Sequence, residues 1–305
     1  MQRFLVRRFL ITIITLFVVS VIVFAMARVS GDPRTMMLGD QFTQKQYEDL
    51  GRTLGLDKPY HEQFWVYIKD LAQGDFGPSI SEGKPAGQVI QQRFVATLEL
   101  GLAAFVFALI VGVPLGILSS VKRGSIFDQI GKLVALTGQS APSFWIGIML
   151  IFFFAVRLEW VPPSGRQDWN SIILPAVTLG WFMVAANMRL VRSAMLDVLD
   201  SEYIKLARAK GVSSVSLIWK HALRNAMIPP LTFAGVTLGN LVAGSVTTEL
   251  VFAWPGLGLL AIDATLSADY PVLQGVVIIF TLLYVAAAFL VDVLYAYIDP
   301  RIRYA

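Results

Sequence analysis

The sequence predicts an all-α, polytopic membrane protein. Of its 305 residues, 56% are hydrophobic and only 15% are charged, whereas soluble domains carry about 25% charged residues. The apolar residues form long runs that lack the period-two alternation of membrane-spanning strands. A soluble enzyme is therefore excluded. The sequence also contains no cysteine, which excludes disulfides, thiolate metal sites and cysteine nucleophiles.

Six runs are long enough to cross a bilayer, because a spanning helix needs roughly 20 mostly apolar residues. The third contains Ser140 and Pro142, which should face neighbouring helices or a wet cavity rather than lipid. In the second, Gly112 and Gly116 form a small-xxx-small pair that indicates helix packing. The first resembles a signal peptide but exceeds the usual apolar core of roughly 7–15 residues, so we expect an uncleaved first span. The six predicted spans are residues 9–27, 96–118, 134–156, 172–191, 229–252 and 272–294.

The distribution of lysine and arginine predicts that the N and C termini are both cytoplasmic. With the N-terminus inside, fifteen of the 25 Lys and Arg residues fall in cytoplasmic segments, several of them directly at span ends. Most of the others lie in one long external segment, where charge has little influence on topology. The net charge of +4 thus reflects membrane topology, and nucleic acid is not an expected partner.

Residues 28–94 form this external segment, which is far longer than a simple connection requires. Glycine and proline turn signals divide it, and short amphipathic helices are expected over residues 44–54 and 61–71. The segment is either a docking surface for an external partner or a packed cap on the helices. The sequence pattern does not decide between the two.

A second long connection, residues 192–228, is predicted on the cytoplasmic side. Ser201 suits the N-cap of a short helix, and Glu202 suits the positive end of the helix dipole. Gly211 is placed as the C-terminal stop of this helix. A second helix is expected to begin two or three residues after Gly211 and to end at a Pro-Pro pair.

The first of these helices has about ten residues and is too short to be stable alone in water, so something must hold it. Ala207 and Ala209 give it a low profile that allows close approach to a partner groove. Lys205, Arg208 and Lys210 supply positive charge around this contact. The alternative is a helix that lies on the membrane with its basic side chains against lipid phosphates.

The stretch Glu202–Gly211, with the sequence EYIKLARAKG, is followed by KHALRNA at residues 220–226 and by Pro229. Together they resemble the "EAA" cytoplasmic loop of bacterial ABC importer permeases, and more narrowly the dipeptide/oligopeptide permease family, which includes relatives for nickel and glutathione. One departure is Tyr203, which stands at the first alanine of the loop's name. The resemblance covers essentially the whole chain, with further matches at LGLD (54–57), GDFG (74–77), WPGLG (254–258) and DPRIRY (299–304).

The resemblance implies the type I ABC importer permease architecture in the bacterial cell (inner) membrane. A homologous second permease subunit would complete the translocation path, and an external, periplasmic or lipid-anchored, substrate-binding protein would deliver the solute. One or two cytoplasmic ATPase subunits would receive the short helix as a coupling helix. The ATPase-docking residues assigned in this way are Ser201, Glu202, Tyr203, Ile204, Lys205, Leu206, Ala207, Arg208, Ala209, Lys210 and Gly211.

The resemblance also divides the chain into three regions. Residues 1–94 comprise the first span and the external segment with its short helices. Residues 95–298 comprise the transmembrane core, which includes the coupling loop 192–228. Residues 299–305 form a cytoplasmic tail.

The resemblance implies a permease subunit of an ATP-driven importer of di- or oligopeptides, working by alternating access, with glutathione or a nickel complex as alternative substrates. No G-x-x-x-x-G-K-[ST] phosphate-binding motif occurs in the sequence. The chain is thus not expected to be an enzyme or to hold a cofactor or metal; the partner ATPases would bind ATP and Mg²⁺. An ion-coupled secondary transporter is the alternative, but such proteins carry ionisable groups deep in the membrane, and only Asp292 lies well inside a predicted span.

Overall fold

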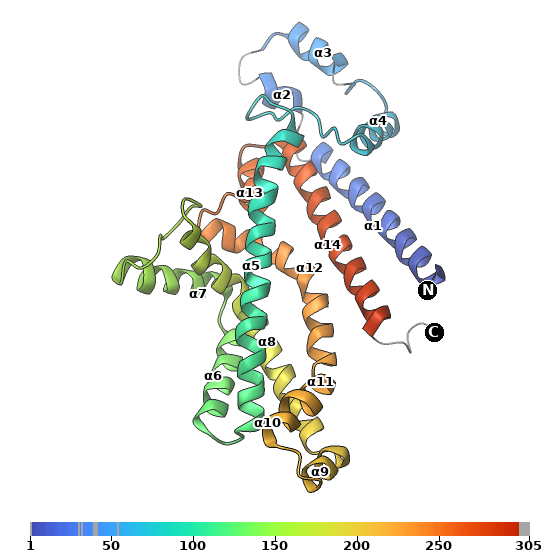
Figure 1. Ribbon diagram of the computed structural model, residues 1–305. Coiled ribbons are helices and arrows are strands. Elements are labelled where there is room, and N and C mark those ends of the chain that lie inside the picture. The colour runs from blue at the N-terminus through green and yellow to red at the C-terminus, as the bar shows by residue number, and fades with distance from the viewer. Residues whose placement is uncertain (1, 30, 32, 39–41, 54, 299–305) are drawn as a thin grey trace. The chain divides into compact units, whose positions relative to one another are not determined.

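The computed structural model describes residues 2–298 except for residues 30, 32, 39–41 and 54. These residues are mainly helical, and the one β-bridge among them joins Pro78 to Pro85 (Figure 1). The last predicted region, residues 299–305, lies outside the described residues. The helices are α1 (Gln2–Val29), α2 (Pro33–Leu38), α3 (Gln44–Thr53), α4 (Tyr60–Ala72), α5 (Ala86–Val121), α6 (Ile126–Ser140), α7 (Ser143–Leu150), η1 (Ile151–Arg157), η2 (Trp169–Ile172), α8 (Ile173–Leu199), α9 (Glu202–Ala209), α10 (Ser214–Ser216), η3 (Leu217–Ala222), α11 (Leu223–Ala226), α12 (Ile228–Val251), α13 (Leu257–Leu266) and α14 (Tyr270–Ile298).

The chain divides into two compact units, which are described separately. Unit 1 comprises Met1–Thr97 and Pro255–Val285, and unit 2 comprises Leu98–Trp254 and Ala286–Ala305. Both units draw on the long helices α5 and α14. The division of the chain into residues 1–94, 95–298 and 299–305 stays a prediction.

The structure contains four to six candidate membrane spans, compared with the six predicted from the sequence. Four segments are single helices long and apolar enough to cross a membrane: Val6–Val29, Ala86–Val121, Trp169–Leu199 and Tyr270–Val291. Two bent pairs of helices raise the number to six if each pair forms one span. One of these pairs lies within α12, where Ile228–Leu241 and Gly244–Val251 differ in direction by 57°.

The third predicted span, residues 134–156, is not one straight helix. It is broken between α6 and the α7–η1 pair, which differ in direction by 115°. Pro142 has no backbone N–H and disfavours helical geometry in the residue before it. Ala141 accordingly adopts an extended conformation with φ −90° and ψ 129°. The apolar run was therefore predicted correctly from the sequence, but the break at Pro142 was not.

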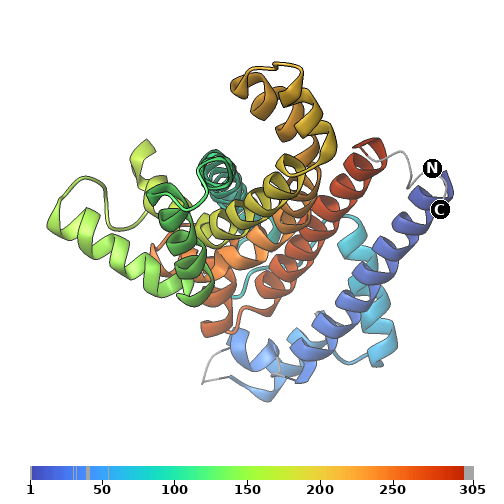
Figure 2. The ribbon, with the colours of Figure 1, turned by 90° about the horizontal axis from the view of Figure 1, so that it is seen from below.

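Unit 2 is organised around α8, which packs against α6, α7 and α12. Glycines bring α5 into backbone contact with α8, because a Cβ at Gly112 would lie 2.9 Å from the Val184 carbonyl oxygen. A Cβ at Gly116 would lie 2.7 Å from the Met188 carbonyl oxygen. The packing role predicted for the Gly112/Gly116 pair is thus confirmed. Figure 2 shows α5, α6 and α8 grouped together in this unit.

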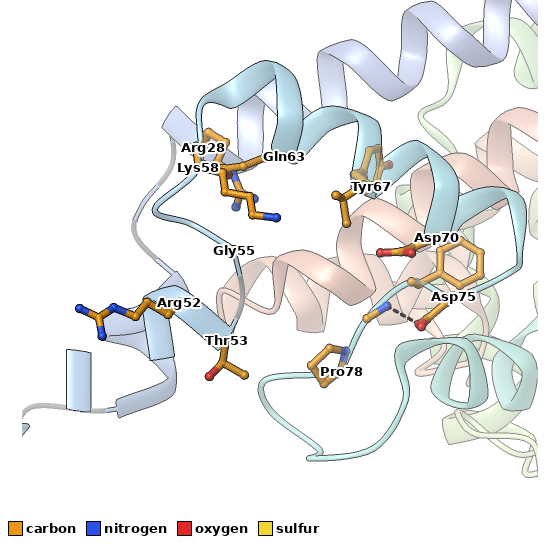
Figure 3. Close-up of a pocket in the computed structure, with 13 residues that line it drawn as sticks. Arg28, Arg52, Thr53, Gly55, Lys58, Gln63, Tyr67, Asp70, Asp75 and Pro78 are labelled. Carbon is orange, nitrogen blue, oxygen red and sulfur yellow. Dashed lines mark hydrogen bonds between the residues drawn. The ribbon is translucent and has the colours of Figure 1, made fainter. Parts of the chain in front are cut away.

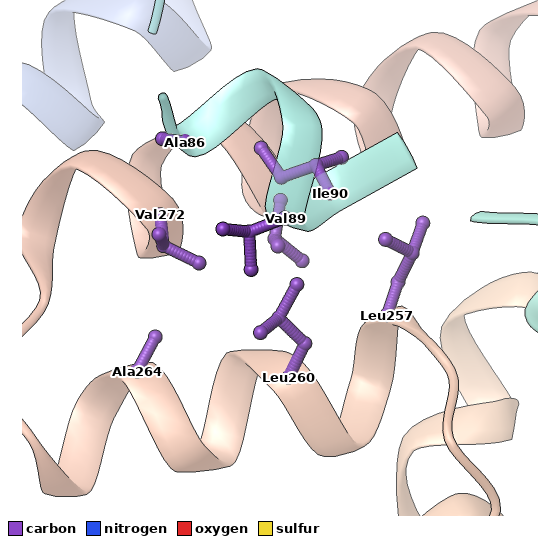
Figure 4. Packing of buried hydrophobic residues seen from close by; sticks show 8 residues of the cluster. Ala86, Val89, Ile90, Leu257, Leu260, Ala264 and Val272 are labelled. Atoms are coloured by element: carbon purple, nitrogen blue, oxygen red, sulfur yellow. The ribbon is translucent and has the colours of Figure 1, made fainter. Parts of the chain in front are cut away.

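Unit 1 has its own apolar core, in which α5, α13 and α14 meet. Its buried residues are Ala86, Val89, Ile90, Leu257, Leu260, Ala264, Val272 and Val276 (Figure 4). The Thr97 hydroxyl oxygen accepts a hydrogen bond of 2.7 Å from the Leu257 backbone N–H, which fixes the start of α13. The sequence prediction missed α13, because its ten residues are too few to register as a span.

A buried carboxylate also holds unit 1 together. Asp269 is fully buried in the turn between α13 and α14, and one of its oxygens accepts hydrogen bonds from the Ser79 hydroxyl, the Ser81 hydroxyl and the Ser81 N–H. Burial alone would raise the pKa of Asp269, but the hydrogen bonds from both serines outweigh it and lower the pKa below the usual value. The end of the predicted external segment is thus tied to the start of α14.

We expect alanine at Gly116 and at Gly101 to have opposite effects, although both glycines lie in α5. Alanine at Gly116 should lower the free energy of unfolding by about 1–3 kcal/mol, because its Cβ overlaps the α8 backbone. Alanine at Gly101 meets no atom within 4 Å and should stabilise the helix by about 0.5–1 kcal/mol. Unfolding temperatures in mild detergent test this, and equal destabilisation by both substitutions would contradict the close contact.

The stabilisation that Asp269 provides should depend on pH. Because its pKa is lowered in the folded protein, the contribution is present above the unfolded-state value of about 4. It is lost as the pH falls through the lower folded-state pKa. The difference in unfolding temperature between wild type and Asp269→Asn should therefore be large at pH 7 and shrink in acid. The exposed Asp263 supplies the control, and the hypothesis fails if Asp263→Asn shows the same pH dependence.

Candidate functional site

The short helix predicted after Ser201 is present as α9, which contacts α8 and η3 at the lower end of unit 2 in Figure 1. Its eight residues come directly after α8, from which Asp200 and Ser201 alone separate it. The prediction of a short helix after Ser201 is therefore confirmed. A further helix, α10, begins at Ser214. Ser213 is its N-cap, and the Ser213 hydroxyl oxygen accepts a hydrogen bond from the Ser216 backbone N–H.

Ser201 occupies the N-cap position, with an extended backbone at φ −71° and ψ 152°. Its hydroxyl, however, donates to the Val198 carbonyl oxygen at the end of α8 and does not cap α9. The backbone carbonyl of Ser201 accepts the first helical hydrogen bonds, from Ile204 and Lys205. Ser201 therefore joins the two helices, although it does so without the side-chain cap that its residue type predicts.

Gly211 ends α9, as the sequence predicts. Its backbone φ is +80°, in the left-handed region that residues other than glycine rarely adopt. Its N–H donates to the Arg208 carbonyl oxygen, and the Val212 N–H donates to the Ala207 carbonyl oxygen. This pair of bonds is the Schellman arrangement, which satisfies the last carbonyl groups of a helix. The exit of the chain from α9 therefore has a fixed direction.

The inner face of α9 is buried in the protein's own core. Ile204 is fully buried in a cluster with Ile117, Val191, Met195, Leu217, Ala222 and Ala226. Ala207 is half-buried and packs against the same cluster. These contacts join α9 to α5, to α8 and to the next helices along the chain. A helix too short to be stable alone is thus held by this chain itself.

The outer face of α9 carries Glu202, Leu206 and Ala209, at the i, i+4 and i+7 positions of one helix face. All three are exposed, and Leu206 exposes 57% of its surface although it is apolar. Ala209 thus lies on the exposed face, whereas Ala207 lies toward the core. The sequence prediction included Leu206 only as one residue of the docking stretch Ser201–Gly211, because spacing alone does not show which face is buried.

Two polar contacts flank the helix. The Tyr203 hydroxyl oxygen accepts a hydrogen bond of 2.8 Å from the Asn225 side-chain amide, which links the start of α9 to α11. Lys205 and Glu202 form an ion pair of 2.8 Å, with 59% and 89% of their side chains exposed. Such an exposed pair contributes little to stability, so its charges remain available to a partner.

A buried charge cluster braces α8 at Arg192, the first residue of the predicted coupling loop. Asp128, at the start of α6, is 1% exposed and accepts hydrogen bonds from Arg192 Nε at 2.8 Å and Nη2 at 3.2 Å. It also accepts from the Ser119 hydroxyl at 2.6 Å and lies 3.1 Å from Lys132 Nζ. We name this set the Asp128 brace. Because it draws on α5, α6 and α8, it fixes the direction in which α8 leaves the helix bundle of unit 2.

The Asp128 brace was not predicted from the sequence. Arg192 and Lys132 belong to the fifteen basic residues that were assigned to cytoplasmic segments, and no role was predicted for Asp128. The two residues that form the ion pair are 64 positions apart, so no local spacing joins them. In the described part of the chain, no group of three or more His, Cys, Asp or Glu residues is arranged to hold a metal ion.

Comparisons with protein families match almost the entire length. The family model described as "Binding-protein-dependent transport system inner membrane component" matches residues 112–304, which include α9. A second model, "Binding-prot-dependent transport system membrane comp, N-term", matches residues 1–101.

Individual relatives agree with these matches. The "Glutathione transport system permease protein GsiC" of Escherichia coli (strain K12) is 42% identical over 305 residues, covering 100% of both chains. The protein of the same description from Shigella flexneri serotype 5b is also 42% identical over that length. Among solved structures, the MetNI methionine ABC transporter in an inward-facing conformation gives a TM-score of 0.58 at 22% identity, covering 70% of this chain and 97% of that chain. An amino acid ABC transporter with histidines gives 0.54 at 12% identity, covering 68% and 92%. These two structures support the fold alone.

Removal of either partner of the Asp128–Arg192 pair should destabilise the protein. Asp128→Leu and Arg192→Met should each lower the free energy of unfolding by about 3 kcal/mol, because each leaves a charge without its buried partner. The double variant should lose less than the sum of the two. Lys132→Met is the control, since its side chain is 61% exposed, and it should cost at most about 1 kcal/mol. Additive losses in thermal unfolding would rule out the coupling.

Proposed function

Because the chain belongs to the family of binding-protein-dependent transport system inner membrane components, we propose that α9 is the point at which a separate ATPase drives it. The chain itself is a permease subunit of an ABC importer and a multi-pass component of the inner membrane. A subunit of this kind needs a source of energy, partner subunits and a substrate.

The energy for transport has to reach this chain through contact. Its sequence contains no G-x-x-x-x-G-K-[ST] motif to hold the phosphates of ATP. We infer that the chain has no enzymatic activity and that ATP and Mg²⁺ are bound by one or two separate ATPase subunits. Closure of the ATPases on ATP would then move a helix that is seated in them, and the permease needs two alternative arrangements rather than a catalytic group.

The outer face of α9 supports this docking role. Leu206 offers an exposed apolar side chain, whose removal from water against a partner would be favourable. Glu202 and Ala209 flank it, and the small side chain of Ala209 allows close approach. The exposed Lys205, Arg208 and Lys210 surround the contact with positive charge, which favours a cleft with acidic edges. Of the remaining residues of Ser201–Gly211, Ile204 and Ala207 support this face from the core.

The inner face of α9 and the Asp128 brace would transmit a displacement of α9 to the spanning helices. Because Ile204 is buried against α5 and α8, a displacement of α9 cannot leave those helices unchanged. The Schellman arrangement at Gly211 connects α9 firmly to the next helices. A push on α9 is therefore passed to the spanning helices α8 and α12, whose tilt would alternate access between the two sides of the membrane. We place α9 and both termini in the cytoplasm, on the distribution of lysine and arginine.

We propose short peptides as the substrate class, with glutathione as the first candidate. This rests on the 42% identity, over the full length, to a permease described as a glutathione transport protein. Oligopeptides and a nickel complex are the alternatives within the wider family. A homologous second permease and an external substrate-binding protein would complete the assembly.

Substitutions on the two faces of α9 should separate docking from folding. Leu206→Glu should abolish recovery of the ATPase in mild-detergent affinity purification and abolish ATP-driven uptake, while the unfolding temperature of the chain stays unchanged. Ile204→Ala lies two residues away on the buried face. It should lower the free energy of unfolding by about 2–5 kcal/mol, because it leaves a cavity in the core.

Wild-type protein is the reference in both assays and should retain an ATP-hydrolysing subunit and accumulate glutathione in proteoliposomes. Normal ATPase recovery and uptake in Leu206→Glu would show that α9 is not the docking site. Accumulation by the chain alone, with only an ion gradient, would instead support the secondary-transporter alternative.

A further inference from the structure

Unit 1 contains a cavity of about 490 Å³ between α4 and the turns on either side of it. This volume lies within the range of about 300–1,000 Å³ that is usual for small-molecule sites. Figure 3 shows the cavity with its labelled side chains. One face of α4 contributes Gln63, Tyr67 and Asp70, which have the i, i+4, i+7 spacing of a single helix face.

The cavity lining carries charges of both signs. Arg28, Arg52 and Lys58 are basic, whereas Asp70 and Asp75 are acidic. In Figure 3, the Lys58 amino group and the Asp70 carboxylate extend into the same space from opposite sides. Neither side chain forms an ion pair with another described residue, whereas Asp75 accepts a hydrogen bond of 2.8 Å from the Gly77 N–H. A positive and a negative group therefore face one cavity without neutralising each other.

Two neutral groups between these charges have unsatisfied hydrogen-bonding capacity. Gln63 is 8% exposed, and its amide nitrogen donates to the Lys58 carbonyl oxygen at 2.7 Å and to the Leu56 carbonyl oxygen at 3.3 Å. Its Oε1 atom is buried without a hydrogen-bond partner among the described residues, as is the Tyr67 hydroxyl. Burial raises the pKa of Tyr67 to about 12, so that this hydroxyl stays protonated and can donate. Such buried polar groups are costly unless a ligand or water satisfies them.

We propose that this cavity binds a small zwitterionic peptide, with its carboxylate on Lys58, its ammonium group on Asp70 and its peptide groups on Gln63 and Tyr67. Peptide N–H groups can donate to Gln63 Oε1, and peptide carbonyl oxygens can accept from the Tyr67 hydroxyl. The seven residue steps from Gln63 to Asp70 cover about 10 Å of helix. This matches an extended tripeptide at about 3.3–3.6 Å per residue. Identification of this ligand with the transported solute rests on the proposed function.

The probe is triglycine, whose binding to the full-length chain in nanodiscs is measured by calorimetry without any external binding protein. N-acetyltriglycine lacks the ammonium group and triglycinamide lacks the carboxylate, so each should bind at least about tenfold more weakly, as expected for the loss of one charge-assisted hydrogen bond. Glycine carries both charges but no peptide group, and it should also bind more weakly. Nanodiscs with and without phosphatidylethanolamine test whether a lipid headgroup occupies the cavity; competition by that lipid would overturn the assignment to a solute.

Matched variants place the binding in this cavity. Lys58→Met and Asp70→Asn should each weaken triglycine binding about tenfold or more. Lys69→Met and Glu62→Gln change exposed groups outside the cavity lining and should leave the affinity unchanged. Tyr67→Phe should weaken binding without lowering the unfolding temperature, because it removes a buried hydroxyl that has no partner among the described residues.

The proposal would be overturned if the Lys58→Met and Lys69→Met variants bound triglycine with equal affinity. It would also be overturned if the wild type bound triglycine, N-acetyltriglycine and triglycinamide with equal affinity. This failure is separate from failure of the proposed function. If the complex accumulates glutathione but these variants bind triglycine normally, the cavity assignment falls and the importer assignment stands. If triglycine binding changes in the variants as expected but no peptide or glutathione is accumulated, the cavity stands and the proposed substrate class falls.

Discussion

The close approach of α8 to its neighbours is the constraint on which unit 2 depends. Carbonyl oxygens of α8 lie 2.9 Å and 2.7 Å from where a Cβ on Gly112 or Gly116 would lie, so a larger residue at either position would push α5 away from α8. Packing at this distance gives van der Waals contact where lipid supplies no hydrophobic force between helices. The Asp128 brace then fixes the C-terminal part of α8, through Arg192. The position of α9 depends on that of α8, because Ser201 joins them almost directly.

A docking element must be firmly attached to its own protein and still present a face to another. In α9, which has eight residues, one face of the helix meets the first requirement and the opposite face meets the second. Ile204 is fully buried and Leu206, two positions later, exposes 57% of its surface. Since adjacent residues of a helix point in different directions, the same short segment serves both requirements. Rigid attachment through buried packing and a defined exit at Gly211 make α9 suited to transmit a displacement rather than absorb it.

Unit 1 differs in character. Its helix α13 and the segment around Ser79 are fixed by buried hydrogen bonds to Thr97 and Asp269. Around α4, by contrast, charged and polar groups are left facing a cavity. Buried polar groups in a folded protein are normally satisfied, so their concentration on one helix face distinguishes this cavity from ordinary packing. It also gives the long external segment a chemical character beyond that of a connection.

The sequence by itself determined the helical membrane class, the six apolar runs, the short helix after Ser201 and its end at Gly211, since these depend on local composition, length and backbone preference. Pro142, which breaks the third apolar run, is also visible in the sequence, although the 115° bend there depends on packing. Only the tertiary structure decided that Ala207 faces inward while Leu206 faces outward, and that Asp128 meets Arg192. Burial and pairing between residues 64 positions apart arise from the folded arrangement of helices, and no local pattern encodes them.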